Sequence, residues 1–492
     1  MSMIKVENLT FSYPSGAENI FENVNFQIDT DWKLGFIGRN GKGKTTFLQL
    51  LLGKYEYRGK IIANVHFDYF PFAVEHGEYL TFDIMREITP LSEDWEIIKE
   101  ISLLEVEEDV LYQQFYTLSQ GEQTKVMLAA LFLKENEFLL IDEPTNHLDD
   151  AARATLCRYL NRKKGFILVS HDRHFLDGCI DHVLAINRAN IEIQKGNFST
   201  WWQNKEWQDG FEAARNAKLK RDISRMETAA RQRAGWSDQV EKTKFGTKPA
   251  DRGFIGHKAA KMMKSAKNLE RRQQGMIEEK RGLLRNIDEQ EALAISPLRY
   301  RENRVCAVSD LSVSYEGRRV FEGVGFEVCV GERVALQGKN GSGKSSILKL
   351  LCGQKLDHEG QLWVGSGVKL SYVSQSTEGL CGSLGDYAAE KGIEYTKLLT
   401  ILRKLGFGRE QFEKDISDFS GGQKKKVLLA GSLCEEAHLY LWDEPLNFID
   451  VISRMQIEAC ILEYQPTLLF VEHDKRFCEK VATKVVSVGG EN

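Results

Sequence analysis

Short apolar runs separated by polar turns recur along both halves of the chain. Residues 4–9 and 24–28 alternate between apolar and polar side chains, and residues 34–37 form an apolar run that enters a glycine-rich loop. The loop leads into FLQLLLG, which has a helical pattern, and the runs FLLI, FILVS, LYLW and TLLFVE follow later. Continuous apolar runs of this length are typical of strands buried on both faces. The pattern therefore predicts an α/β fold with a mainly parallel sheet.

The pattern of the first half returns in the second half at a nearly constant spacing. Matching landmarks are 300 to 302 residues apart: Lys44 and Lys344, Asp142 and Asp443, Ser119 and Ser420, His171 and His473. A repeat held in register over so many landmarks indicates a duplicated domain. We expect one domain at residues 1–200, a second at residues 298–492, and a linker at residues 201–297.

Composition excludes several classes of protein. The chain has 492 residues, 42% of them hydrophobic and 28% charged, which is typical of globular domains and not of a disordered tail. No apolar stretch approaches eighteen residues and residues 1–10 lack a secretory signal, so we expect neither a membrane span nor secretion. The nine cysteines are scattered and odd in number, which favours reduced thiols in the cytoplasm over disulfides or a zinc ribbon.

The net charge of −5 conceals a positive segment in the middle of the chain. Residues 201–300 carry 22 Lys or Arg against 14 Asp or Glu, a local charge of +8. The excess lies within residues 231–275, which hold 12 basic and 4 acidic side chains. The predicted linker is therefore the basic part of an otherwise acidic protein.

Both glycine-rich loops match the pattern G-x-x-x-x-G-K-[ST], as GRNGKGKT and GKNGSGKS. In such a loop, glycines let backbone N–H groups surround phosphate oxygens, the lysine reaches the β and γ phosphates, and the hydroxyl can bind Mg²⁺. The predicted phosphate-binding residues are Gly38, Asn40, Gly41, Gly43, Lys44, Thr45 and Thr46, and Gly338, Asn340, Gly341, Gly343, Lys344, Ser345 and Ser346.

About 98 residues after each lysine, an apolar strand ends in Asp-Glu. Asp142 and Asp443 can hold the metal together with Thr45 and Ser345, while Glu143 and Glu444 can polarise the attacking water. These motifs therefore predict two sites that bind phosphate and Mg²⁺ and can activate an attacking water.

These motifs resemble those of the ATP-binding cassette ATPases over almost all of both halves. The most specific resemblance is the signature, LSQGEQ at 118–123 and FSGGQK at 419–424. The resemblance implies that each signature completes the other half's nucleotide site, and that a histidine contacts the γ-phosphate and a tyrosine stacks on adenine. The residues concerned are Ser119, Gly121 and Glu122, Ser420, Gly421, Gly422 and Gln423, His171 and His473, and Tyr13 and Tyr315.

Two positions depart from the family's pattern. Where the family has a glutamine in the shell of the metal and water, the second half has Gln375 but the first has Phe72, which cannot bind a metal. The first signature has Gln120 where the second has Gly421, and a side chain there crowds the γ-phosphate. We therefore expect two unequal sites that both keep their carboxylates.

The predicted linker consists of two helical stretches, up to about Ala234 and from about His257 to Ala294, with a tip at residues 235–256. Positions four and three apart between Met262 and Ile287 favour a two-helix coiled coil. Basic and aromatic side chains are interleaved at the tip and just after it, and they suit contacts with structured RNA. With Ile255, the candidate residues are Trp236, Lys242, Lys244, Phe245, Lys248, Arg252, Phe254, Ile255, His257 and Lys258. A hairpin that acts only as a spacer is the alternative.

Paired cassettes with a basic helical linker resemble the ABC-F proteins. Within that group, the chain resembles the Lsa-like antibiotic-resistance branch in four segments: TDWKLGFIGRNGKGKTT, GFILVSHDRHF, KGNFS and DRGFIGHKAAKMMK. The resemblance implies a cytoplasmic protein that binds the ribosome at its exit site, with ribosomal RNA and transfer RNA as partners. It also implies action against lincosamides, streptogramin A and pleuromutilins, with no membrane subunits and no need for a stable homo-oligomer. A housekeeping ABC-F translation factor, an importer ATPase and a DNA-repair cassette protein are the alternatives.

Overall fold

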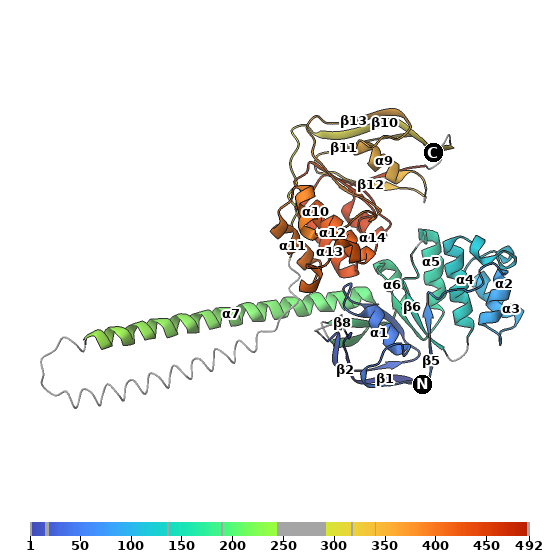
Figure 1. Ribbon diagram of the computed structural model, residues 1–492, viewed down its shortest axis with the longest axis horizontal. Helices are drawn as coiled ribbons and strands as arrows, with labels where there is room; N and C mark the ends of the chain where they lie inside the picture. The colour runs from blue at the N-terminus through green and yellow to red at the C-terminus, as the bar shows by residue number, and fades with distance from the viewer. Residues whose placement is uncertain are drawn as a thin grey trace. The chain divides into compact units, whose positions relative to one another are not determined.

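The computed structural model describes residues 2–14, 19–134, 137–146, 148–187, 190–243, 292–315, 318–339 and 341–489. The chain divides into two compact units, Met1–Trp201 with Glu291–Asn492, and Trp202–Gln290. The first unit contains both cassettes (Figure 1). Among the described residues, no helix is both long and apolar enough to cross a bilayer.

Each cassette is built on a parallel sheet, as the apolar runs predict. The first has the order β5 (His66–Phe70), β6 (Glu137–Asp142), β7 (Phe166–Val169), β3 (Lys33–Ile37), β8 (His182–Asn187) and β9 (Asn190–Lys195). The second has the order β14 (Leu370–Val373), β15 (Leu439–Asp443), β16 (Leu468–Val471), β12 (Arg333–Gln337) and β17 (Lys484–Ser487). Only the pairing of β8 with β9 is antiparallel in these two sheets as described.

A small antiparallel sheet accompanies each parallel sheet. One has the order β2 (Phe21–Asp29), β1 (Met3–Phe11) and β4 (Arg58–Ile62), and the other β11 (Arg318–Cys329), β10 (Arg304–Tyr315) and β13 (His358–Val364). Apolar side chains of each small sheet join one core with the neighbouring parallel strands. The fold class predicted from the sequence, two α/β cassettes, is confirmed.

Helices cover the parallel sheets and form a separate helical region in each cassette. The first cassette contains α1 (Lys44–Leu51), α2 (Thr81–Ile88), α3 (Asp94–Leu103), η1 (Glu108–Tyr112), η2 (Phe115–Thr117), α4 (Gln120–Leu133), α5 (Asp150–Asn161) and α6 (Arg173–Cys179). The second contains α9 (Lys344–Leu351), α10 (Leu384–Lys391), α11 (Tyr395–Lys404), η3 (Arg409–Gln411), η4 (Ile416–Asp418), α12 (Gly421–Cys434), α13 (Val451–Tyr464) and α14 (Lys475–Val481).

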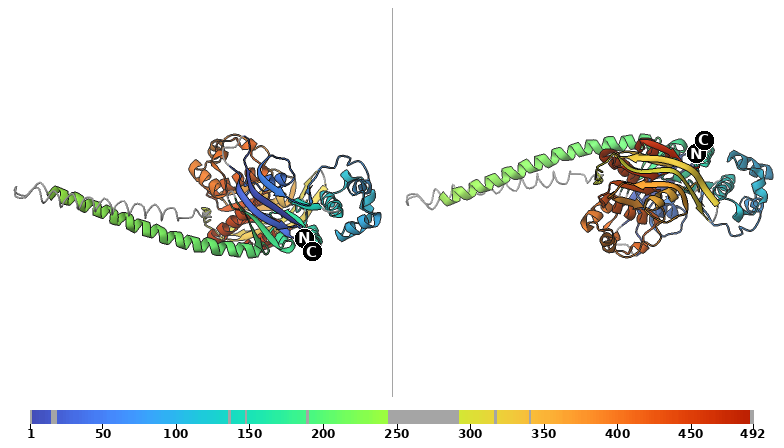
Figure 2. Two further views of the ribbon diagram at one scale, coloured as in Figure 1. Left: turned by 90° about the horizontal axis from the view of Figure 1, so that it is seen from below. Right: turned by 90° about the horizontal axis from the view of Figure 1, so that it is seen from above.

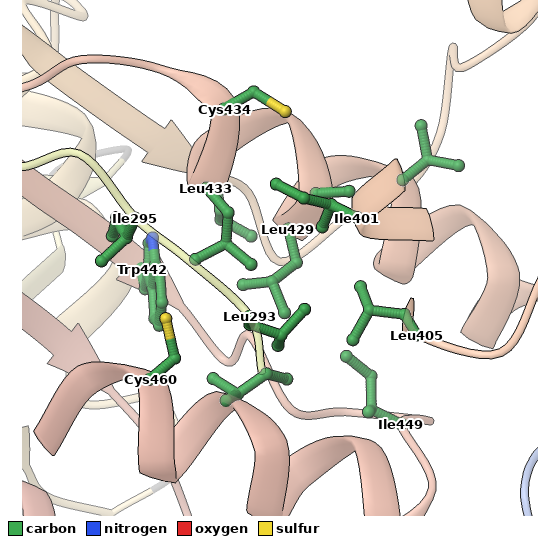
Figure 3. Close-up of a cluster of buried hydrophobic side chains, with 14 of the residues drawn as sticks. Leu293, Ile295, Ile401, Leu405, Leu429, Leu433, Cys434, Trp442, Ile449 and Cys460 are labelled. Atoms are coloured by element: carbon green, nitrogen blue, oxygen red, sulfur yellow. The ribbon is translucent and has the colours of Figure 1, made fainter. Parts of the chain in front are cut away.

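The segment that enters the second cassette is part of that cassette's core. Leu293 and Ile295 are each 2% exposed and belong to a cluster that includes Leu429 and Trp442 (Figure 3). The boundary at residue 298 that the repeat predicts puts residues 292–297 in the linker. Their alternating apolar side chains pack inside the cassette, which therefore begins before residue 298.

The linker begins with α7 (Phe198–Thr243), a single uninterrupted helix, as Figure 2 shows. At 1.5 Å per residue its 46 residues span about 70 Å, more than the arm of about 30 residues that the sequence suggests. The helix continues through Gly235, where we expected the tip to start. One glycine in a helix costs only about 1 kcal/mol, and residues 236–243 contain no proline to end it. The predicted second helical stretch lies outside the described residues, apart from residues 292–294, which are not helical.

Candidate nucleotide-binding sites

The two glycine-rich loops join a central strand to a helix, β3 to α1 and β12 to α9. Gly43 and Gly343 have φ angles of 97° and 87°, a region that favours glycine. A Cβ atom at Gly43 would lie 2.6 Å from Ile20, and one at Gly343 would lie 2.4 Å from the Phe321 ring. Any other residue would strain the loop, so glycine keeps the first N–H groups of each helix accessible to an anion.

The two loop lysines bend back over their loops. Lys44 Nζ donates to the Gly38 carbonyl at 2.7 Å, and Lys344 Nζ donates to the Gly338 carbonyl at 2.8 Å. Both side chains are buried, and burial lowers the pKa of each ammonium group. Each loop therefore holds one cation beside its exposed N–H groups, as phosphate binding requires.

The hydroxyl after each lysine meets the aspartate at the end of the neighbouring strand. Thr45 Oγ1 lies 3.4 Å from Asp142 Oδ2, and Ser345 Oγ lies 3.0 Å from Asp443 Oδ1. Asp443 is fully buried, and its Oδ2 has no hydrogen-bond partner within the part of the chain that the structure describes. Burial raises the pKa of both aspartates. A hydroxyl beside a carboxylate with an unpaired oxygen fits a hard divalent cation such as Mg²⁺.

The glutamate after each aspartate has an unusual backbone conformation. Glu143 and Glu444 have φ angles of 51° and 47°, where residues other than glycine are strained. Their N–H groups donate to the carbonyls of Val169 and Val471 at 2.9 and 3.0 Å, so the adjacent strands hold the strained turn. Backbone strain held by surrounding structure is common at functional sites.

A histidine on the next strand faces each glutamate. His171 Nε2 lies 3.3 Å from Glu143 Oε1, and His473 Nε2 lies 3.6 Å from Glu444 Oε1. Burial, with the nearby Asp142 charge, raises the pKa of Glu143 to about 8.

The pKa of Glu444 moves in the opposite direction. Burial alone would raise it, but hydrogen bonds with His473 and Gln375 outweigh burial and lower the pKa of this carboxyl. Asn447 Nδ2 also donates to Glu444 Oε2. Phe72, at the position that corresponds to Gln375, cannot make the equivalent contact, so the two sites differ as the sequence indicates.

The predicted adenine-stacking tyrosines lie beside the loops. Tyr13 Oη is 2.9 Å from Thr46 Oγ1, and Tyr315 Oη is 2.9 Å from Ser346 Oγ. Each hydrogen bond ties a ring to the first turn of the helix that follows the loop.

Each signature serine begins a helix as its N-cap. Ser119 Oγ accepts from the Glu122 N–H at the start of α4, and Ser420 Oγ accepts from the Gln423 N–H at the start of α12. The side chains of Glu122 and Gln423 accept in return from the N–H groups of the two serines, which completes a capping box in each cassette. The signatures therefore present helix N-termini, where anions bind favourably.

The second signature lies against the first glycine-rich loop. Asn40 Nδ2 donates to the Phe448 carbonyl at 2.7 Å, and the Asn40 N–H lies 3.3 Å from Asp450 Oδ2. A Cβ atom added to Gly422 would come within 3.1 Å of Asn40 Nδ2. The structure thus brings the loop with Lys44 and the signature at Ser420–Gln423 together, as the family resemblance implies.

The other pair of motifs is arranged differently. A cavity of about 470 Å³ surrounds the second loop and is lined by residues from both cassettes, including Lys344, Glu444 and His473, and Glu143 and His171. The first signature residues Ser119, Gly121 and Glu122 do not line this cavity. The structure therefore brings the second signature to the first loop, whereas the first signature does not line the cavity at the second loop.

Some of the predicted site residues are not among those that the structure describes. Asn340 and the tip residues Lys244, Phe245, Lys248, Arg252, Phe254, Ile255, His257 and Lys258 lie outside the described residues. Trp236 and Lys242 lie within helix α7.

Two interactions between the cassettes involve residues that the motifs do not include. Asp450 contacts the first loop and pairs with Lys426 at 2.6 Å. Burial raises its pKa, but the Lys426 and Lys44 charges outweigh burial and hold it well below the ordinary value. Asp149 occurs 301 residues earlier, so the repeat contained a signal for this position.

A buried ion pair joins the two cassettes, and the sequence repeat does not indicate it. Arg173 Nη2 donates to Glu458 Oε2 at 2.7 Å, and both side chains are less than 10% exposed. The corresponding residues of the other cassette are Lys475 and Cys157, so the pair is not repeated.

The model of the ABC transporter family matches residues 21–146 and 321–447. The ribosome protection protein VmlR of Bacillus subtilis is 28% identical over 97% of this chain and 86% of its own length. The energy-dependent translational throttle protein EttA of Escherichia coli K12 is 27% identical over 76% of this chain and 64% of its own length. Among solved structures, archaeal ribosome recycling factor aABCE1 in complex with stalk protein aP1 matches with a TM-score of 0.61, 19% identity, and coverage of 98% of this chain and 88% of that chain.

The chain belongs to the ABC transporter family, because its model matches slightly more than half of the residues. Both cassettes carry the family's ATP-binding elements, and the chain is an ATPase. The relatives support a place among the tandem-cassette proteins of the ABC-F group.

Proposed function

We propose that this ATPase binds the ribosome and protects it from antibiotics of the peptidyl-transferase centre: lincosamides, streptogramin A and pleuromutilins. ATP binding favours the ribosome-bound form and hydrolysis allows release. The observation that carries the proposal is the similarity to a ribosome protection protein over 97% of this chain, through both cassettes and the basic segment between them.

We propose two composite ATP sites. The first combines Lys44, Asp142, Glu143 and His171 with Ser420–Gln423, and the contact between Asn40 and Phe448 supports this pairing. The second combines Lys344, Asp443, Glu444 and His473 with the first signature. For that site, closing onto ATP has to bring Ser119, Gly121 and Glu122 to the cavity around Lys344.

In each site the water that attacks the γ-phosphorus loses its proton to the glutamate, and the bond to the β–γ bridging oxygen breaks. Glu444 is positioned for this role by His473 and Asn447, and Glu143 by His171. The strained backbone fixes the direction of each carboxylate. The lysines and the signature helix termini stabilise charge on the phosphate oxygens.

The donor set suits Mg²⁺ in both sites. Ser345 and Asp443, with Gln375, would hold the ion in the second site, and Thr45 and Asp142 in the first. Bound Mg²⁺ would neutralise negative charge on the β and γ phosphates. The two aspartates differ in their partners. In the first site Tyr69 Oη donates to Asp142 Oδ2 at 3.0 Å. In the second site Asp443 Oδ2 has no hydrogen-bond partner among the described residues.

We propose that the basic linker carries the contact with ribosomal RNA and transfer RNA near the exit site. The two cassettes provide the ATP-driven closure. They comprise residues 1–200 and 298–492, and the second also includes the buried segment at residues 292–297. The proposal requires no membrane subunits and no stable homo-oligomer, and it places the protein in the cytoplasm.

The two sites should contribute unequally to turnover. Glu444→Gln alone should remove more than half of the steady-state ATPase rate, and Glu143→Gln alone less than half, because Gln375 contacts Glu444 and Phe72 offers nothing comparable. Phosphate release from the purified variants measures this. Gln120 at the first signature should reduce this difference between the sites, because its side chain crowds the second site. Equal losses of ATPase rate would show that having Phe72 in place of a glutamine does not affect turnover.

Protection itself is testable in a bacterial in vitro translation reaction inhibited by a lincosamide. Added protein with ATP should restore at least half of the lost synthesis, whereas the Lys44→Ala, Lys344→Ala variant should restore none, because phosphate binding at both loops is lost. Reactions without the lincosamide control for a direct effect on translation.

A housekeeping translation factor is the second candidate, favoured by the similarity to EttA. Such a protein would change the rate of drug-free translation in an ATP-dependent manner and would leave inhibition by the lincosamide unchanged. The translation reaction therefore separates the two functions.

A further inference from the structure

Exposed aromatic side chains gather on the helical region of the first cassette. Six large hydrophobic residues there are 40–86% exposed: Tyr79, Leu80, Leu91, Trp95, Tyr112 and Tyr116. These six define the aromatic face. In the corresponding segment of the second cassette, residues 375–419, Tyr395 alone is similarly exposed. The aromatic face is thus a feature of one cassette and is not required by the cassette fold.

Backbone hydrogen bonds join the first part of the aromatic face. The Phe115 N–H donates to the Tyr79 carbonyl at 3.2 Å, and the Tyr116 N–H donates to the Gly77 carbonyl at 3.0 Å. The segment before α2 and the segment of η2 therefore lie side by side, with Tyr79 and Tyr116 in adjacent positions.

Side-chain contacts extend the face to α3. The Phe82 and Tyr112 rings stack with centroids 6.3 Å apart, and the Arg86 guanidinium lies 4.5 Å from the Phe82 centroid. Arg86 Nε also donates to Asp94 Oδ1 at 3.0 Å, immediately before Trp95. Helices α2 and α3 lie at one edge of the first cassette, beyond α4 (Figure 1). The exposed rings therefore lie on neighbouring segments of one helical region, in which α2 and α3 both contact η1.

The segment that carries these rings is strongly acidic. Residues 72–118 contain twelve Asp or Glu against two Lys or Arg, a net charge of −10. The corresponding residues 375–419 contain eight acidic and six basic side chains, a net charge of −2. Glu107, Glu108 and Asp109 are exposed just before Tyr112. An acidic surface repels a phosphate backbone, so the aromatic face does not suit RNA.

We propose that the aromatic face is a docking surface for a Lys- and Arg-rich segment of a partner protein. Exposed aromatic clusters mark protein interfaces, and tyrosine and tryptophan are enriched at their energetic centres. Lys and Arg bind over such rings, as Arg86 does over Phe82 beside this face. The acidic surroundings attract a basic partner and raise its rate of association. This proposal is independent of the assignment of the ATP sites and of drug protection.

The test uses the full-length protein and a fluorescent 18-residue peptide of Arg, Lys and Leu. Two comparison probes are the same peptide with every Arg and Lys replaced by Glu, and an 18-nucleotide RNA. Wild-type protein should bind the basic peptide at 50 mM salt. The Trp95→Ala, Tyr112→Ala, Tyr116→Ala variant should bind it at least ten times more weakly, measured by fluorescence anisotropy.

Two further variants keep the result interpretable. The Glu107→Lys, Glu108→Lys variant leaves the rings in place and should weaken peptide binding at least fivefold. The control variant Tyr395→Ala, Tyr464→Ala changes two exposed rings of the second cassette and should bind the peptide as the wild type does. Retained ATPase activity shows that each variant is folded. Equal binding of the basic peptide by the wild type and both face variants would overturn the proposal, as would RNA binding that the aromatic substitutions abolish.

Discussion

The Glu143→Gln, Glu444→Gln variant should retain ATP binding and hydrolyse ATP about 10²–10⁴ times more slowly than the wild type, the usual range for loss of a general base. Glutamine keeps the size of each side chain but cannot accept the proton of the attacking water. The loop lysines, the hydroxyls and the two aspartates stay in place, so nucleotide affinity should change little.

Single-turnover phosphate release and fluorescent ATP-analogue binding measure these two quantities. Tyr395→Ala, an exposed substitution in the second cassette, is a suitable control for handling and purity. A double variant that hydrolyses ATP at the wild-type rate would contradict the assignment of the two glutamates.

Replacement of residues 244–255 by a Gly/Ser loop of equal length should abolish drug protection and leave basal ATPase activity unchanged. The replacement removes basic and aromatic side chains suited to structured RNA, while every described contact of the two nucleotide sites is outside it. The in vitro translation reaction with a lincosamide and a growth assay in a susceptible host measure protection.

Ribosome binding by this loop variant should weaken less than protection, because the cassettes offer additional contact surface. A useful control replaces only Gly246, Thr247 and Ala250 of the same segment, which preserves the charges and rings. Full protection by the loop variant would show that the tip is only a spacer.

The parts of the fold that depend on local sequence could be predicted. The glycine-rich loops, the apolar strands before Asp142 and Asp443 and the two-cassette organisation follow from short motifs and from the repeat. A local motif such as Ser420–Gln423 even specifies its own structure, because the capping box it forms is set by residues three apart.

Features that depend on the tertiary structure were not predictable. The pairing of Arg173 with Glu458 joins residues 285 positions apart and has no counterpart in the repeat. Leu293 precedes the boundary that the repeat predicts, and only the packed core of the second cassette shows where it belongs. The repeat pairs Asp450 with Asp149, but the contact of Asp450 with the first loop depends on how the two cassettes contact each other.

Co-sedimentation with purified bacterial ribosomes through a sucrose cushion tests the central claim of an ATP-dependent ribosome-binding protein most directly. The Glu143→Gln, Glu444→Gln variant should pellet with ribosomes in ATP at close to one copy per ribosome, and should remain largely in the supernatant in ADP. An equal, low pelleted fraction in both nucleotides, from a variant shown to bind ATP, would contradict the account.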